Sequence, residues 1–140
     1  MKETDRLESL VDALKCLPGV GPKSALRLAY YLLQRNRKGA KNLSNSITDA
    51  LEQLGNCKLC NNFSELQICN ICSSSKRDQH TLCVVEMPTD LLMMEQTHSY
   101  KGMYFVLMGR LSPLDGIGPK EIHLNTLIER IKRADIREVI

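Results

Sequence analysis

The chain has 140 residues, of which 43% are hydrophobic and 25% charged, a balance typical of one to three small globular modules. Its first ten residues are rich in charge and no apolar run approaches the ~20 residues of a membrane helix, so we expect neither a secretory signal nor a membrane protein. The sequence favours a cytoplasmic protein, and in that reducing compartment its six cysteines indicate a metal site or buried thiols in place of disulfides.

The net charge of +3 is unevenly distributed along the chain. Residues 13–48 contain seven Lys or Arg residues and no Asp or Glu, whereas residues 49–140 contain ten basic and twelve acidic residues. A basic block joined to a nearly neutral body is typical of a nucleic-acid contact surface. The charge alone is equally compatible with a solvated helical face.

Helices are predicted throughout the basic third of the chain. Apolar residues at i, i+3, i+4 and i+7 spacing predict a first helix over 5–16, which ends at Pro18-Gly19. A second helix is predicted over 22–34, with Pro22 at its first position. Residues 35–42 are polar, basic and interrupted by a glycine, so we expect a linker or helix end there. A third helix over 44–54, capped by one of two serines, should follow.

The second half of the chain alternates between short apolar runs and helical patterns. The predicted elements are a strand at 81–86, a helix at 89–96, a strand at 103–107, a helix at 120–133 and a strand at 137–140. This order is typical of a parallel α/β unit. Because such a sheet usually has further elements beyond its last strand, we expect the chain to be a fragment or a shortened form.

Four cysteines form two C-x-x-C pairs separated by eight residues, within a polar segment at 56–76 that has no helical period. Four thiolates at this spacing predict one tetrahedral, structural Zn²⁺ site with no open coordination position. A rubredoxin-like iron site and unliganded thiols are the alternatives. The predicted ligands are Cys57, Cys60, Cys69 and Cys72. The other two cysteines, Cys16 and Cys83, have aliphatic neighbours and are expected to be core thiols.

The segment LPGVGPK at 17–23 joins the first two helices through two glycines. A tight glycine turn beside a helix N-terminus can direct backbone N–H groups at an anion, and here it predicts contact with the DNA backbone. A plain helix–helix corner is the alternative. The similar string LDGIGPK at 114–120 is expected to be a strand-to-helix loop, with a second phosphate-binding hairpin as the alternative. The predicted DNA contacts are Gly19, Val20, Gly21, Lys23, Arg27, Arg35, Arg37 and Lys38.

Four stretches together resemble the RecR family of recombination mediator proteins: LPGVGPKSALRLAYYLL, the C-x2-C-x8-C-x2-C pattern, TLCVVE and GRLSPLDGIGP. The resemblance implies an α+β protein of several modules. These are a helix-hairpin-helix region at 1–55, a four-cysteine zinc finger at 56–76 and an incomplete Toprim-like α/β domain at 79–140. RecR proteins continue past the residues that match the end of this chain, so the resemblance implies a C-terminally shortened member.

The same resemblance implies a function. Family members act in bacterial DNA repair with RecO, and in some pathways RecF, to load recombinase on gapped or single-stranded DNA, and they assemble as dimers and ring-like tetramers. Toprim enzymes hold Mg²⁺ with a strand-end Glu and a later Asp-x-Asp pair; Glu86 occupies the first position here, but the sequence contains no Asp-x-Asp. We therefore expect no enzymatic activity. The alternative is a fragment of a Toprim or ligase-type DNA enzyme.

Overall fold

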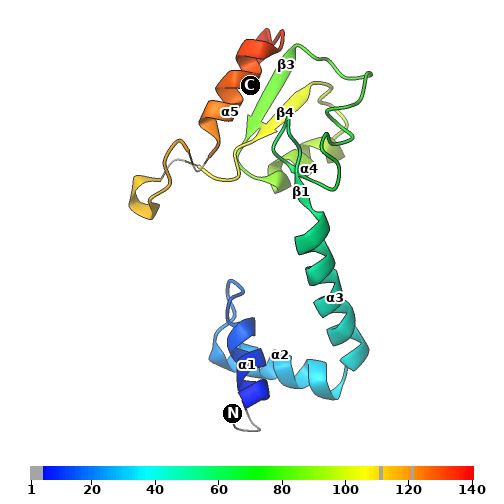
Figure 1. Cartoon of the computed structure of the whole chain (residues 1–140), viewed down its shortest axis with the longest axis vertical. Coiled ribbons are helices and arrows are strands. Elements are labelled where there is room, and N and C mark those ends of the chain that lie inside the picture. The colour runs from blue at the N-terminus through cyan, green and yellow to red at the C-terminus, as the bar shows by residue number, and fades with distance from the viewer. Residues whose placement is uncertain (1–4, 111, 121) are drawn as a thin grey trace. The chain divides into compact units, whose positions relative to one another are not determined.

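The computed structural model describes residues 5–110, 112–120 and 122–140. The chain divides into two compact units, Met1–Glu52 and Gln53–Ile140 (Figure 1). Within the described ranges, no helix is both long and apolar enough to cross a membrane.

The first unit contains the helices α1 (Asp5–Leu14), α2 (Pro22–Gln34) and most of α3 (Arg37–Gln53). α1 packs against α2, as the predicted apolar stripe requires. The residues of α2 that are fully buried are Ala25 and Ala29, one turn apart. Because both side chains are small, the second helix can approach the first closely.

The predicted linker at 35–42 is wrong, because α3 begins at Arg37. Asn36 caps this helix: its side-chain oxygen accepts a hydrogen bond from the Gly39 N–H at 2.9 Å, and its backbone carbonyl accepts one from Ala40. A Cβ on residue 39 would lie 2.5 Å from the Asn36 side-chain amide, so the glycine gives the cap its space. The glycine that suggested a break is thus part of the helix start. The apolar stripe of α3, including Ile47 and Leu51, is exposed.

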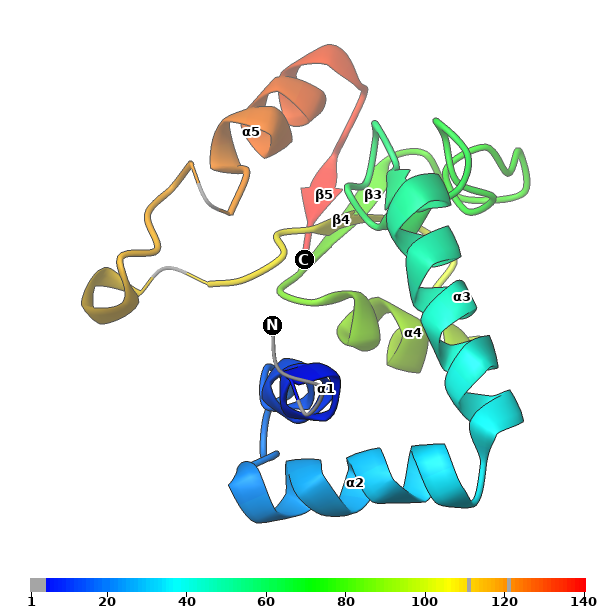
Figure 2. The same ribbon diagram turned by 60° about the horizontal axis from the view of Figure 1, so that its bottom comes forward.

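The second unit contains a three-stranded parallel sheet in the order β4-β3-β5 (Figure 2). Its central strand β3 pairs with both neighbours through Leu82, which lies opposite Met103 on β4 and Val139 on β5. This confirms the predicted parallel α/β unit. The elements are β1 (Gly55–Asn56), β2 (Phe63–Ser64), β3 (Thr81–Val85), α4 (Pro88–Gln96), β4 (Met103–Val106), η1 (Pro113–Asp115), α5 (Leu124–Arg133) and β5 (Glu138–Val139).

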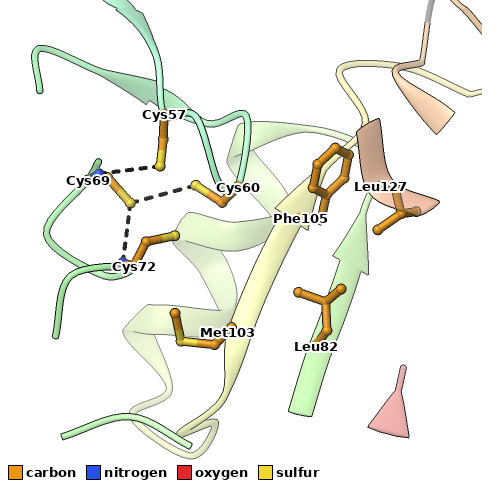
Figure 3. Packing of buried hydrophobic residues seen from close by; sticks show 8 residues of the cluster. All are labelled: Cys57, Cys60, Cys69, Cys72, Leu82, Met103, Phe105 and Leu127. Carbon is orange, nitrogen blue, oxygen red and sulfur yellow. Dashed lines mark hydrogen bonds between the residues drawn. The ribbon is translucent and has the colours of Figure 1, made fainter. Parts of the chain in front are cut away.

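The two faces of the sheet have different cores. Tyr104 and Val106 point to one face and pack with Cys83 and with Leu91 of α4. Phe105 and Met103 point to the other face, where they pack with α5 and with the four cysteines of the two C-x-x-C pairs (Figure 3). The cysteine segment therefore belongs to the core of the α/β unit.

Two sequence expectations differ from the structure at helix ends. The first helix ends two residues early, at Leu14, because the N–H groups of Cys16 and Leu17 bond to carbonyls three residues back in a closing turn. That turn leaves Cys16 exposed, so the expectation of a core thiol is wrong there, whereas Cys83 is buried as expected. α5 begins later than predicted, at Leu124, and residue 121 of the predicted helix lies outside the described residues.

Candidate metal centre and nucleic-acid interface

Each C-x-x-C pair forms one zinc knuckle, the first at 57–60 and the second at 69–72. Their four thiols converge between the two knuckles and the sheet (Figure 3). Their ligand atoms all lie within 4.8 Å of one another, and the Cys60 and Cys69 sulfurs are 3.6 Å apart. A tetrahedron with Zn–S bonds of ~2.3 Å has edges of about 3.8 Å, so the donor set fits one zinc ion. Each residue is at most 8% exposed, which leaves no room for substrate at the metal. The site is structural.

The knuckle backbone prepares the sulfurs to bind a cation. Asn61 adopts a left-handed conformation with φ of +66°, which turns the chain after the first pair so that the Asn61 N–H bonds to the Cys57 carbonyl at 2.9 Å. The Cys69 N–H donates to the Cys57 sulfur at 3.3 Å, and the Cys72 N–H donates to the Cys69 sulfur at 3.5 Å. Hydrogen bonds of this kind stabilise thiolates over thiols.

The thiol cluster concentrates negative charge on one sulfur. A hydrogen bond from the Cys72 thiol is the main cause that lowers the pKa of Cys60 to about 5. Donating that bond raises the pKa of Cys72, and burial raises the pKa of Cys69. Of these three sulfurs, Cys60 loses its proton most readily, and Cys69 and Cys72 release theirs when a cation binds.

The first knuckle is attached to the outer edge of β4. The Val106 N–H donates to the Cys60 carbonyl at 2.7 Å, and the Asn61 side-chain amide donates to the Val106 carbonyl at 2.9 Å. Arg130 of α5 donates to the carbonyls of Leu59 and Tyr104. The finger thus satisfies backbone groups that an unprotected edge strand would expose. The roles of Asn61 and Arg130 were not predicted from the sequence, because no local pattern indicates contacts between residues 45 and 71 positions apart.

In the first unit, residues 17–23 between α1 and α2 form a hairpin that is built on a tight turn. The Val20 N–H bonds to the Leu17 carbonyl at 3.2 Å, and Gly19 has φ of +78°. Proline followed by a left-handed residue is the pattern of a type II turn, which explains the glycine. The side chain of Val20, one of the predicted DNA contacts, is half-buried.

Gly21 precedes α2 as its N-cap and has an extended backbone, φ −91° and ψ −175°, that any residue can adopt. A Cβ placed there would meet nothing within 4 Å. The fold therefore does not require a glycine at this position. Because Gly21 has no side chain, the start of α2 is accessible from outside. The first N–H groups of the helix have no intrahelical acceptor there, and the helix dipole is positive at that end.

The predicted basic contacts fall into two groups. Lys23 and Arg27 are exposed and one turn apart beside the hairpin. Arg35 lies at the other end of α2, next to Arg37 and Lys38. At a rise of ~1.5 Å per residue, it is about 18 Å from Lys23 along the helix axis. Arg37 also donates to the Leu33 carbonyl at 3.1 Å, so part of its guanidinium closes the end of α2.

The second glycine string forms the expected connection between a strand and a helix. Ser112 and Ile117 exchange backbone hydrogen bonds across it, both at 2.9 Å, and Gly116 has φ of +71°. The Ser112 hydroxyl donates to the Asp115 carboxylate at 2.8 Å. The loop thus places an acid, Asp115, at the position that Pro18 has in the first glycine string.

Glu86 follows β3 and is exposed, and its backbone carbonyl accepts a hydrogen bond from Gly109 at 2.9 Å. Of the groups of three or more potential metal-binding side chains among the described residues, none includes Glu86. The structure therefore places this acid at the expected strand end, and within the described ranges it brings no pair of acids to it.

Comparison with protein-family models gives three matches. Residues 7–51 match the model described as RecR, helix-hairpin-helix, and residues 54–74 match the RecR zinc finger domain with four cysteines. Residues 80–140 match the Toprim domain. The second match and the thiol geometry agree that the four cysteines hold one structural zinc ion. The helix-hairpin-helix and zinc-finger matches point to nucleic-acid binding.

Proposed function

The chain belongs to the RecR family, which acts in DNA recombination and repair, and we propose that it is a non-catalytic mediator that grips the DNA backbone through its glycine hairpin. In this proposal a phosphate is bound at the open start of α2. Lys23 and Arg27 add charge beside it, and the group around Arg35 extends the contact along the strand. Contacts of this kind position a protein on DNA without reading its bases.

The observation that carries the proposal is the open backbone at Gly21. Neither strain nor an internal clash requires a glycine there, so its value lies in what can approach from outside. A phosphate oxygen approaches helix N–H groups most closely where no side chain intervenes.

The test is DNA binding by Gly21→Ala and the bulkier Gly21→Val. Both should bind a single-stranded oligonucleotide more weakly than the parent, with valine worse, and both should keep their zinc. Gly55→Ala is the matched control, because its backbone also has room for a methyl group, with only the Ser64 carbonyl nearby at 3.9 Å. Equal affinity of Gly21→Val and the parent would refute phosphate binding at the hairpin.

The absence of catalysis is also part of the proposal. Phosphoryl chemistry on a Toprim core needs several acids around Mg²⁺, and Glu86 has no Asp-x-Asp partner in the sequence. We assign Glu86 no part in turnover. Incubation of labelled DNA with the protein and Mg²⁺ should leave the DNA uncut and unjoined.

The partners in the proposal follow from the family. We propose that the chain works in the bacterial cytoplasm with RecO, and in some pathways RecF, to help load recombinase on gapped or single-stranded DNA. Self-assembly into dimers or tetramers is part of the same proposal. The exposed apolar side chains of α3, Leu43, Ile47 and Leu51, support it because they offer surface for a second copy.

A further inference from the structure

A groove in the second unit lies between the first knuckle and α5, on the sheet face that these two elements share. Its volume is about 320 Å³, the size of a small ligand site. The residues that give it its chemistry are Lys58, Leu59, Met103, Glu129, Arg130 and Arg133. None of them belongs to the zinc ligands or to the hairpin.

The groove combines an apolar floor with a positive rim. Leu59 is 39% exposed although it is a large aliphatic residue, and Met103 lies at the bottom of the groove in the core. Three cations surround them against the single carboxylate of Glu129, which is 3.5 Å from Arg133. The surplus positive charge favours an anionic ligand, and the floor favours one that carries an aliphatic group.

The rim is partly held in place before any ligand arrives. Arg130 Nη1 donates to the Leu59 carbonyl at 2.7 Å and to the Tyr104 carbonyl at 2.5 Å, which fixes the guanidinium against the groove wall. Its Nη2 atom has no hydrogen-bond partner among the described residues. A fixed guanidinium loses little entropy when it binds a carboxylate.

We propose that this groove binds a short acidic segment of a partner protein, with an aliphatic side chain inserted between the knuckle and α5. Carboxylates of the segment pair with Lys58, Arg130 and Arg133. A protein is favoured over single-stranded nucleic acid because no lining residue is aromatic, and base stacking on aromatic rings is the usual basis of such binding. The surface is additional to the proposed DNA contact at the hairpin.

The test uses the intact zinc-loaded chain and a fluorescent peptide with one leucine between two pairs of aspartates. Fluorescence anisotropy should show saturable binding. Replacing the leucine with glycine, or the aspartates with asparagines, should weaken it about tenfold each, as expected when a buried aliphatic group or several charge pairs are lost. If the parent peptide and both changed peptides bound with the same affinity, the proposal would be wrong. It would also be wrong if the parent peptide did not bind.

Matched protein variants locate the site. Arg133→Glu should weaken peptide binding about tenfold, whereas Lys132→Glu, the neighbouring exposed cation outside the groove, should change it less than about twofold. Leu59→Ser should weaken binding, whereas Leu66→Ser, an exposed leucine elsewhere in the finger, should not. Equal losses within either pair would contradict binding in the groove.

A parallel titration with a single-stranded oligonucleotide separates the two ligand classes. Arg133→Glu should reduce oligonucleotide binding no more than Lys132→Glu does. If Arg133→Glu selectively weakened the oligonucleotide and left the peptide unaffected, the groove would be a nucleic-acid site and the proposal would be wrong. Peptide binding does not depend on the hairpin, so a failure of the DNA proposal would leave this result interpretable.

Discussion

Arg130 on α5 donates a hydrogen bond to the carbonyl of Leu59 in the first zinc knuckle, across 71 residues of sequence, at 2.7 Å. The same Nη1 atom also bonds to Tyr104 on β4. One side chain thereby joins the helix, the metal site and the sheet. Zinc binding and the stability of the α/β unit are therefore coupled.

Metal removal should affect the sheet as well as the finger. Chelation should release about one zinc per chain and should expose β4 to solvent, because the Cys60 carbonyl no longer holds the Val106 N–H. Hydrogen exchange followed by mass spectrometry should show faster exchange at 103–106. The helices of the first unit should keep their exchange rates. Zinc content far below one per chain in protein purified without chelator would contradict the site itself.

Arg130→Ala should destabilise the second unit by about 2–4 kcal/mol, since it removes two hydrogen bonds from a charged donor. Lys132→Ala, on the same helix but exposed, should change stability by less than about 0.5 kcal/mol. Urea unfolding of zinc-loaded protein measures both. Similar values for the two variants would show that the hydrogen bonds from Arg130 do not hold the unit together.

A second link, between α4 and the sheet, should make stability depend on pH. Burial disfavours the Glu95 carboxylate, but hydrogen bonds from Arg77 and Tyr104 outweigh it and lower the pKa of Glu95 below the usual 4.5. A lowered folded pKa means that the contribution is complete above about pH 4.5 and is lost as the pH falls through the folded pKa.

Glu95→Gln should therefore cost about 1–3 kcal/mol at neutral pH and progressively less below pH 4.5. The quantity to measure is the difference in unfolding free energy between variant and parent at each pH, so that acid release of zinc, common to both, cancels. Exposed Glu65→Gln is the control and should show no such trend. A Glu95 difference that is constant from about pH 7 to about pH 3.5 would contradict the assignment.

The features predicted correctly from sequence are those encoded locally. The cysteine spacing predicts the thiol cluster, and the alternation of apolar runs with helical patterns predicts the parallel order of β3, β4 and β5. The start of α3 was missed because the Asn36 cap and Gly39 act together, while each alone indicates a break. The attachment of the finger to β4 was missed because it depends on backbone carbonyls, which carry no sequence signal.

DNA affinity measured against salt concentration for Lys23→Ala, Arg27→Ala and the parent tests whether the hairpin of this zinc-stapled protein grips the DNA backbone. Removal of a phosphate contact should lower affinity equally for unrelated base sequences and make the salt dependence shallower. Lys101→Ala, an exposed cation of the second unit outside the zinc finger, should leave both the affinity and the salt slope unchanged. Parental affinity and an unchanged salt slope in both hairpin variants would show that the hairpin does not bind the DNA backbone.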